Sequence, residues 1–271
     1  MGAVDETQAS VLASRTIGDA WLMIADRILR LGVPATWDAL PISEIRTVIL
    51  EIARPNPEDP QIERFGDAQR LAWMHSNFTD FTRVHALGDA ASYASRLYDY
   101  LRTGRDQVRW VIDRLATDPT RRDVIITTLE PTLDTTYVPC VSLLDFWIPE
   151  GRLELVVTAH SIDFGTKGYA NLVELADLQH RVARELSIPV GRLHLSVKSA
   201  HIYEPEIDAM SATCASAEAG SRVQPCVTDT HTLDREAPRY GHPPMCDEGS
   251  PAGQLRPLGF SPPGRDRHSR I

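Results

Sequence analysis

Five short motifs in the middle of the chain carry side chains that could act together on one small ligand. They are, in chain order, Pro139-Cys140, Ser161-x-Asp163, Asn171, Val190-Gly191 and His201-x-Tyr203. The thiolate form of a cysteine is a strong nucleophile near neutral pH. Serine, asparagine, histidine and tyrosine add hydrogen-bond donors and acceptors that could hold a polar molecule beside it. The set is compatible with nucleophilic chemistry on a bound ligand.

Each of these residues also has an ordinary structural explanation when it is taken alone. A free cysteine such as Cys140 is most often a small apolar side chain in a core. A Ser-x-Asp pair is common at helix starts, where both side chains accept hydrogen bonds from backbone N–H groups. The functional interpretation therefore depends on the motifs occurring together.

The elements that must position the motifs follow from the spacing of apolar residues. Helical spacing predicts helices at 16–31, 107–116 and 168–187, and the region 63–103 is helical but ambiguous. Strands are predicted at 47–52, 124–129, 141–148, 152–160 and 192–203, with a hairpin turn at Pro149-Glu150-Gly151. Helices between long strands, without regular βαβ alternation, indicate an α+β fold on a large sheet.

The character of the chain changes near Met210. Residues 211–271 contain eight prolines and no apolar periodicity of either kind. We therefore predict a domain at 1–210 and a Pro/Gly/Arg-rich, poorly ordered tail at 211–271, which contributes little to the stable core.

Composition excludes several classes of function. The net charge of −9 over 271 residues argues against a nucleic-acid polymer as partner. None of the four cysteines (Cys140, Cys214, Cys226 and Cys246) forms a CxxC pair, so no zinc site is expected. The N-terminus lacks the features of a signal peptide, and no apolar run approaches the roughly 20 residues of a membrane span. A cytoplasmic protein without a membrane partner is expected.

Taken together, the motifs resemble those of the thymidylate synthase and pyrimidine-nucleotide hydroxymethylase superfamily. Its Pro-Cys, Ser-x-Asp, Asn, Val-Gly and His-x-Tyr motifs occur in this order, and the spacing from Pro139 to Tyr203 agrees without insertion or deletion. Upstream, the stretch 118–122 (Asp-Pro-Thr-Arg-Arg) resembles the family's Asp-Pro followed by paired arginines, and Tyr93 resembles the tyrosine of its Tyr-Gly loop. The resemblance implies a single domain with a large mixed sheet packed with helices.

The resemblance also implies a reaction. C5 of a pyrimidine is a poor nucleophile until a group adds to C6, and Cys140 would be that group, with Tyr93 as a second catalytic residue. The phosphate of the nucleotide would be bound by Arg121, Arg122, His160 and Ser161. Asn171 would bind the base edge, and His201 and Tyr203 the ribose hydroxyl. Asp163 would bind the pterin of the cofactor, 5,10-methylenetetrahydrofolate. The family's arginine pair crosses a two-fold axis, which implies a homodimer formed by sheet packing.

Several positions depart from the family's pattern. Val141 stands where the family has His, His160 where it has Arg, Lys167 where it has Gly, and Arg70 where it has its acid–base Glu. Glu63 or Asp67 could replace that carboxylate, and Phe78 or Phe81 could form the folate wall.

Three alternative interpretations follow. In the first, the chain transfers a hydroxymethyl or methyl group to C5, and uracil is the favoured base because the cytidylate hydroxymethylases carry Asp at the Asn171 position. In the second, it catalyses folate-independent decarboxylation, dehalogenation or exchange through the same adduct. In the third, it is an inactive nucleotide-binding homologue.

Overall fold

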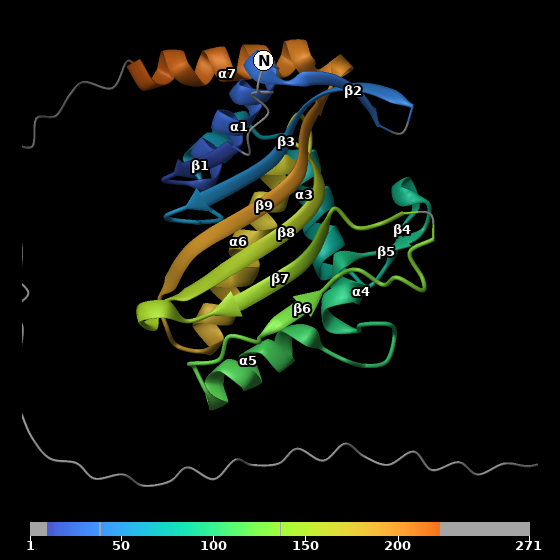
Figure 1. The fold of residues 1–271 in the computed structure, drawn as a ribbon, viewed down its shortest axis with the longest axis vertical. Helices are drawn as coiled ribbons and strands as arrows, with labels where there is room; N and C mark the ends of the chain where they lie inside the picture. Colours follow the sequence, from blue (N-terminus) through green and yellow to red (C-terminus); the bar gives the residue numbers. More distant parts are fainter. Residues whose placement is uncertain (1–9, 38, 136, 223–271) are drawn as a thin grey trace, which may run out of the picture. The chain divides into compact units, whose positions relative to one another are not determined.

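A computed structural model describes residues 10–37, 39–135 and 137–222, and one large mixed sheet runs through them (Figure 1). Its strands are β1 (Ser10–Ser14), β2 (Val33–Trp37), β3 (Leu40–Ile52), β6 (Ile125–Thr127), β7 (Val141–Trp147), β8 (Leu153–Asp163) and β9 (Val190–Tyr203). Their order is β1-β3-β9-β8-β7-β6, and β2 pairs with β3. A short ribbon of β4 (Arg83–Val84) and β5 (Ala90–Ala91) stands apart.

Most strand pairs are antiparallel, but β1 is parallel to β3, and β8 is parallel to β9, to which it is joined through a helix. β7 and β8 form the predicted hairpin, whose turn at Pro149–Gly151 places Glu150 at φ 53° and Gly151 at φ 74°. Positive φ values are the conformation that tight turns demand and that glycine adopts without steric cost.

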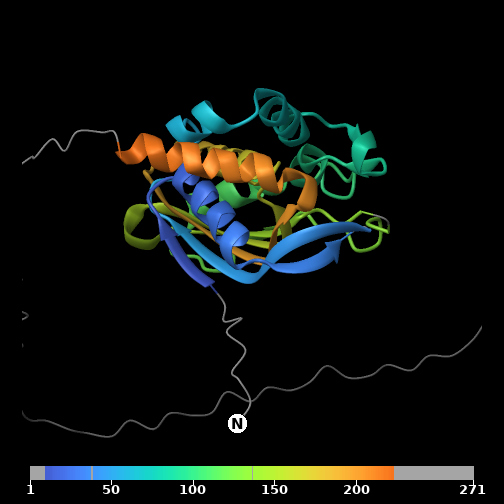
Figure 2. The same ribbon diagram turned by 90° about the horizontal axis from the view of Figure 1, so that it is seen from above.

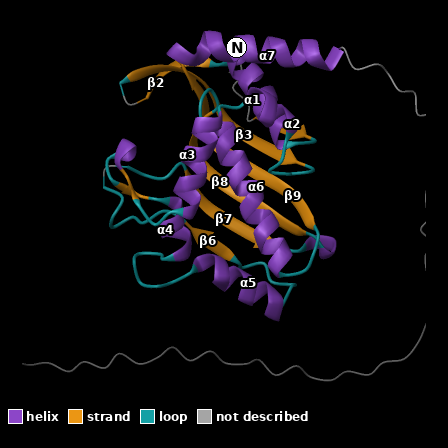
Figure 3. Ribbon diagram, turned by 180° about the vertical axis from the view of Figure 1, so that it is seen from behind, coloured by secondary structure: helices purple, strands orange, loops and turns teal. Residues whose placement is uncertain are grey.

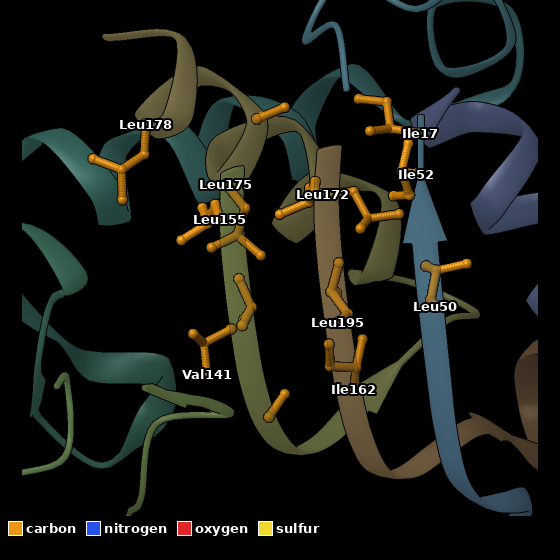
Figure 4. Packing of buried hydrophobic residues seen from close by; sticks show 14 of the residues in the cluster. Ile17, Leu50, Ile52, Val141, Leu155, Ile162, Leu172, Leu175, Leu178 and Leu195 are labelled. Carbon is orange, nitrogen blue, oxygen red and sulfur yellow. The ribbon is translucent and has the colours of Figure 1, made fainter. Parts of the chain in front are cut away.

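The helices are α1 (Ile17–Leu31), α2 (Pro60–Phe65), α3 (Ala68–Thr79), α4 (Tyr93–Tyr98), α5 (Gln107–Thr117), α6 (Gly168–Glu185) and α7 (Ile207–Arg222). Figure 3 shows α1, α3 and α6 lying over the same face of the sheet. α6 buries Leu172, Leu175 and Leu178 at helical spacing, and Figure 4 shows Leu175 beside Leu155 of β8 and Leu172 on the side of Leu195 of β9. This layer of large aliphatic side chains forms the core and fixes α6 against both parallel strands.

Helix α1 is tied directly to the segment that follows β8. Thr16 caps the helix by accepting a hydrogen bond from the backbone N–H of Asp19. The indole of Trp21 donates to the carbonyl of Phe164 at 2.9 Å, and both residues are buried. The loop that carries Asp163 toward α6 is therefore held from the N-terminal part of the chain.

These observations confirm the predicted α+β class with a large mixed sheet and correct some element boundaries. The strand predicted at 47–52 is part of the longer β3, and the strand predicted at 124–129 shortens to β6. The ambiguous region 63–103 contains the end of α2 followed by α3, β4, β5 and α4. No helix in the described ranges combines the length and the apolar character needed to cross a bilayer.

The predicted boundary at residue 210 is wrong, because it falls inside α7. Met210 and Cys214 are buried, and α7 packs along α1 (Figure 2). The helix is rich in alanine, which favours helices but leaves little of the large-residue periodicity that sequence patterns rely on. Residues 211–222 thus belong to the domain, while the rest of the predicted tail, 223–271, lies outside the described residues.

Candidate active site

The predicted site residues of β7, β8 and β9 gather at one end of the sheet. Cys140 immediately precedes β7, and Val141 pairs with Ala159 near the end of β8. In the parallel pair, Asp163 at the end of β8 lies opposite His201 on β9. The register therefore brings the thiol and the Ser161-x-Asp163 and His201-x-Tyr203 motifs to neighbouring strand ends, with the start of α6 following directly after β8.

The backbone of Cys140 and Val141 is held by three hydrogen bonds from different elements. The carbonyl of Cys140 accepts from the N–H of His160 at 3.0 Å. The N–H of Val141 donates to the hydroxyl oxygen of Tyr93 at 3.0 Å, and the Val141 carbonyl accepts from the hydroxyl of Thr128. A shift in strand register lies between Val141 and Leu143, an irregularity of the kind that re-aims side chains next to active sites.

Tyr93 is buried beneath this backbone, where its ring stacks on Phe78 with centroids 4.6 Å apart. Burial raises the pKa of the Tyr93 hydroxyl, and the nearby Cys140 raises it further, so the phenol keeps its proton. Phe78 is thus engaged in the core, and Phe81 is 61% exposed and contacts Tyr98. Neither phenylalanine is among the residues that line the groove beside Asp163.

The sulfur of Cys140 lies 3.8 Å from the hydroxyl oxygen of Tyr137. Burial raises the pKa of the Cys140 thiol above its ordinary range. The Tyr137 hydroxyl and the charge of Lys167 act in the opposite direction, and the charge of Asp163 adds to the effect of burial. The free protein therefore holds Cys140 mainly as a thiol near neutral pH, and additional stabilisation is needed to populate the thiolate.

His201 is buried at the centre of the cluster with one ring nitrogen unsatisfied. Its Nδ1 lies 3.4 Å from the Ser161 hydroxyl, and its ring meets the edge of Tyr203 at 5.1 Å between centroids. Its Nε2 is buried and has no hydrogen-bond partner among the described residues. Burial lowers the pKa of His201, against the opposing charge of Asp163, so the ring is neutral at neutral pH. An orphaned buried polar atom of this kind is suited to a ligand hydroxyl.

Asp163 and Asn171 bracket the turn into α6. The Asp163 carboxylate accepts from the backbone N–H groups of Gly165 at 3.0 Å and Thr166 at 3.3 Å, and from the Thr166 hydroxyl. The side-chain amide of Asn171 donates to the carbonyl of Lys167 at 3.1 Å. Both residues are buried, and Asp163 also lines the groove described below.

A groove of about 810 Å³ opens beside these strand ends. Its lining includes Arg70, Trp73, Asp163, Lys167, Tyr203 and Glu206. The Lys167 ammonium lies 5.6 Å from the centre of the Trp73 ring, and Arg70 forms an ion pair with Glu206 at 3.6 Å. The groove thus combines an aromatic face with groups of both charges, next to the predicted folate-binding Asp163.

Comparison with known proteins places this arrangement in a family. The model of the thymidylate synthase family matches residues 37–225. The chain belongs to the thymidylate synthase family. A candidate thymidylate synthase of Methanosarcina barkeri is 30% identical over 207 residues, covering 73% of this chain and 91% of that protein. One of Methanococcoides burtonii is 29% identical over 213 residues, covering 75% and 94%. The thymidylate synthase of varicella-zoster virus is 33% identical over 127 residues, covering 46% and 42%.

Within one copy of this thymidylate synthase family protein, the predicted phosphate-binding arginines lie away from Cys140. Arg121 pairs with Asp123 at 2.9 Å, and Arg122 lies over the ring of Trp147 at 5.6 Å. Trp147 ends β7, whereas Cys140 precedes its start, and six residues of strand span about 20 Å. The two arginines are therefore not brought to the thiol of their own chain.

His160 is separated from the other predicted phosphate ligands in a different way. Alternate residues of β8 are buried, and Ser161 belongs to that buried set, while His160 and its neighbour Lys198 lie on the other face of the sheet. Burial lowers the pKa of His160, and the charge of Lys198 lowers it further, so His160 carries no charge at neutral pH.

The structure shows where the carboxylates near the groove lie, including one that the sequence analysis did not consider. Asp67 lines the groove, but its carboxylate caps α3 by accepting from the N–H groups of Gln69 and Arg70. Glu63 lines a different cavity, beside His75. Glu206 is instead the carboxylate that meets Arg70 in the groove, three residues after the His201-x-Tyr203 motif. Its position close after that motif was the available sequence signal.

Proposed function

We propose that this protein transfers a one-carbon unit from methylenetetrahydrofolate to C5 of a pyrimidine nucleoside monophosphate through a covalent adduct of Cys140 at C6. Membership of the thymidylate synthase family supports one-carbon transfer to a pyrimidine C5 in general. The observation that carries the proposal for this chain is the buried, unsatisfied Nε2 of His201 on the strand next to the one that ends beside Cys140.

In the first step, the thiolate sulfur of Cys140 forms a bond to C6 of the base. The electron pair of the C5–C6 double bond moves to the C4 carbonyl oxygen, so C5 becomes nucleophilic as part of an enolate. Bound folate would supply the methylene carbon that becomes attached to C5. Completing the transfer would require loss of the C5 proton, cleavage of the bond between that carbon and the folate nitrogen, and addition of a hydride from the tetrahydrofolate for a methyl product or of water for a hydroxymethyl product. Expulsion of the sulfur would then restore the C5–C6 double bond and the thiolate.

The nucleotide would be oriented by neutral groups at the strand ends. A neutral His201 can accept a hydrogen bond from, or donate one to, a ribose hydroxyl through Nε2, because its Nδ1 faces Ser161. Asn171, buried in the first turn of α6, offers an amide for the base edge. Both assignments need a ligand that enters from the groove side, where Tyr203 is half-buried.

The phosphate would be neutralised across a homodimer. Arg121 and Arg122 lie about a strand length from their own Cys140, so they can serve only the site of a second copy. Their position at the far end of the sheet agrees with a dimer that packs the open sheet faces together and exchanges these arginines.

The groove next to the nucleotide position would hold the folate. A flat pterin packs on aromatic faces, which Trp73 supplies, and Asp163 supplies the carboxylate. Lys167 and Arg70 give the groove positive charge suited to carboxylates of the cofactor.

One observation favours a second candidate function. The Lys167 ammonium lies over the Trp73 ring and so covers the face on which a pterin would stack. If Lys167 keeps this position, the Cys140 adduct still labilises groups at C5, and the reaction is folate-independent exchange, decarboxylation or dehalogenation.

The test is tritium release from C5-labelled UMP, dUMP, CMP and dCMP, with and without methylenetetrahydrofolate. We expect release from one of the uracil nucleotides that requires folate, and its loss in Cys140→Ser. The matched control is Cys214→Ala, because Cys214 is buried on α7 against Leu22 and its removal leaves the thiol chemistry intact. Release without folate selects folate-independent exchange, and absence of release from all four nucleotides refutes both one-carbon transfer and exchange.

A further inference from the structure

Tyr137 is a half-buried residue whose hydroxyl group the proposed reaction has not used. It precedes Cys140 by three residues, in the loop between β6 and β7. Its hydroxyl oxygen lies 3.8 Å from the Cys140 sulfur, within the range of a hydrogen bond to sulfur. Burial raises the pKa of Tyr137, and the neighbouring Cys140 raises it further, so this phenol keeps its proton whenever the thiol ionises.

The chain that leads from β6 toward Tyr137 is held by hydrogen bonds from the buried Arg96 side chain. The buried guanidinium of Arg96 donates to the carbonyl of Thr128 at 2.7 Å and to both oxygens of Asp134 at 2.7 and 2.9 Å. The N–H of Glu130 donates to Asp134 at 2.7 Å. These bonds fix the chain from β6 to Asp134, three residues before Tyr137.

The other titratable groups around the sulfur are few. Lys167, at the start of α6, lowers the pKa of Cys140 by its charge, and Asp163, at the end of β8, raises it. Tyr93, from α4, is close enough to influence both Tyr137 and Cys140, but its hydroxyl already accepts from the Val141 N–H. Of these groups, Tyr137 is the one whose hydroxyl lies within hydrogen-bonding distance of the sulfur in the described part of the chain.

We infer that Tyr137 is a catalytic residue that donates a hydrogen bond to the Cys140 thiolate and so sets the fraction of the enzyme that carries a reactive nucleophile. Its catalytic role rests on the proposed function, whereas its hydrogen bond to the sulfur does not. A hydrogen bond to a charged acceptor is stronger than one to a neutral acceptor, so the phenol stabilises the thiolate more than the thiol.

During the reaction, Tyr137 keeps its proton. When the sulfur bonds to C6, its negative charge moves through the C5–C6 double bond to the C4 oxygen, and the thioether becomes a weak acceptor. The hydrogen bond from Tyr137 weakens at that point and is restored when the sulfur leaves. Tyr137 therefore favours both formation of the thiolate and its release from the product.

The experiment measures alkylation of Cys140 by iodoacetamide between pH 6 and pH 11, with peptide mass spectrometry to separate Cys140 from the other three cysteines. In Tyr137→Phe, we expect the midpoint of the rate profile to rise by about one pH unit, which is a tenfold lower rate at any pH below both midpoints. The matched control is Tyr98→Phe, because Tyr98 bonds to Arg181 on α6 and its profile should superimpose on the wild type.

A purely structural role for Tyr137 gives the opposite result. If the hydroxyl only supports the loop, Tyr137→Phe exposes the thiol to water, and the midpoint falls toward that of a free cysteine. An unchanged or lowered midpoint overturns the inference. Replacing Tyr137 with 3-fluorotyrosine, a stronger donor of nearly the same size, should lower the midpoint and covers the case in which the phenylalanine variant does not fold.

The outcome is separable from that of the proposed function. The alkylation profile needs no nucleotide, so it can show the Tyr137 effect even if no nucleotide releases tritium. Conversely, tritium release could depend on Cys140 while the alkylation profile of Tyr137→Phe stays unshifted. That pair of results would support the proposed function and exclude Tyr137 from the reaction.

Discussion

The buried cluster around Arg96 predicts a large loss of stability when its positive charge is removed. The Arg96 side chain is 2% exposed, and it forms an ion pair with Asp134, which is 4% exposed, close to Glu130, which is fully buried. In Arg96→Met, the carboxylate of Asp134 stays buried without its guanidinium, and Glu130 keeps its ion pair with Arg102 and its hydrogen bond from the Leu101 N–H.

Breaking one partner of such a buried pair costs about 3–5 kcal/mol. For a domain of this size, that corresponds to a fall of roughly 6–20 °C in the thermal midpoint. The assay is calorimetry on the full chain, with Arg109→Ala as the control, because Arg109 belongs to an exposed pair with Asp113 and should leave the midpoint unchanged. The double variant Arg96→Met with Asp134→Leu should recover part of the loss, since it removes the stranded charge. An Arg96→Met protein that melts with the wild type would refute the reasoning.

The remaining predictions concern the cofactor, the end of the domain and pH. Asp163→Asn keeps an acceptor for the N–H groups of Gly165 and Thr166, so the local fold should be preserved. A folate-dependent enzyme should then lose turnover but keep its nucleotide affinity, measured by calorimetric titration. Unchanged turnover would exclude one-carbon transfer. A chain ending at 222 should melt like the full chain, whereas one ending at 210 should melt lower because it loses the part of α7 that packs on α1; equal midpoints for both would contradict that role. Burial lowers the pKa of His201 and of His160, so the unfolded chain takes up protons first as the pH falls. Stability should therefore be full above about pH 6.5 and decline below it, and His201→Gln should flatten that decline in unfolding midpoints measured from pH 5 to pH 8.

The sequence predicted the elements whose signals are local. α6 was recognised because Leu172, Leu175 and Leu178 recur at helical spacing and all face the sheet. The β7–β8 hairpin was recognised because its turn at 149–151 has the residues that such turns require. Most of the motifs from Pro139 to Tyr203 lie at the ends of β7, β8 and β9 or at the start of α6, whereas Val190-Gly191 lies at the start of β9, beside Leu153.

What the sequence could not predict depends on contacts between distant segments. The groove joins Arg70 and Trp73 of α3 to Glu206, more than 130 residues later, and no local pattern links them. The contact of Tyr137 with Cys140 depends on the path of a loop, which the buried Arg96 determines. α7 was missed for a different reason: small residues such as Ala212 and Ala217 form helices without a stripe of large apolar side chains.

The place of β9 in the sheet has a consequence for how the chain is made. β9 is the last strand of the sheet along the chain, yet it lies between β3 and β8. Until residues 190–203 have left the ribosome, β3 and β8 each expose an unpaired edge, and the sheet exists only as separate halves. A nascent chain stalled within α6 would therefore present two open strand edges to other chains, and synthesis of β9 completes the sheet and the candidate active site in the same step.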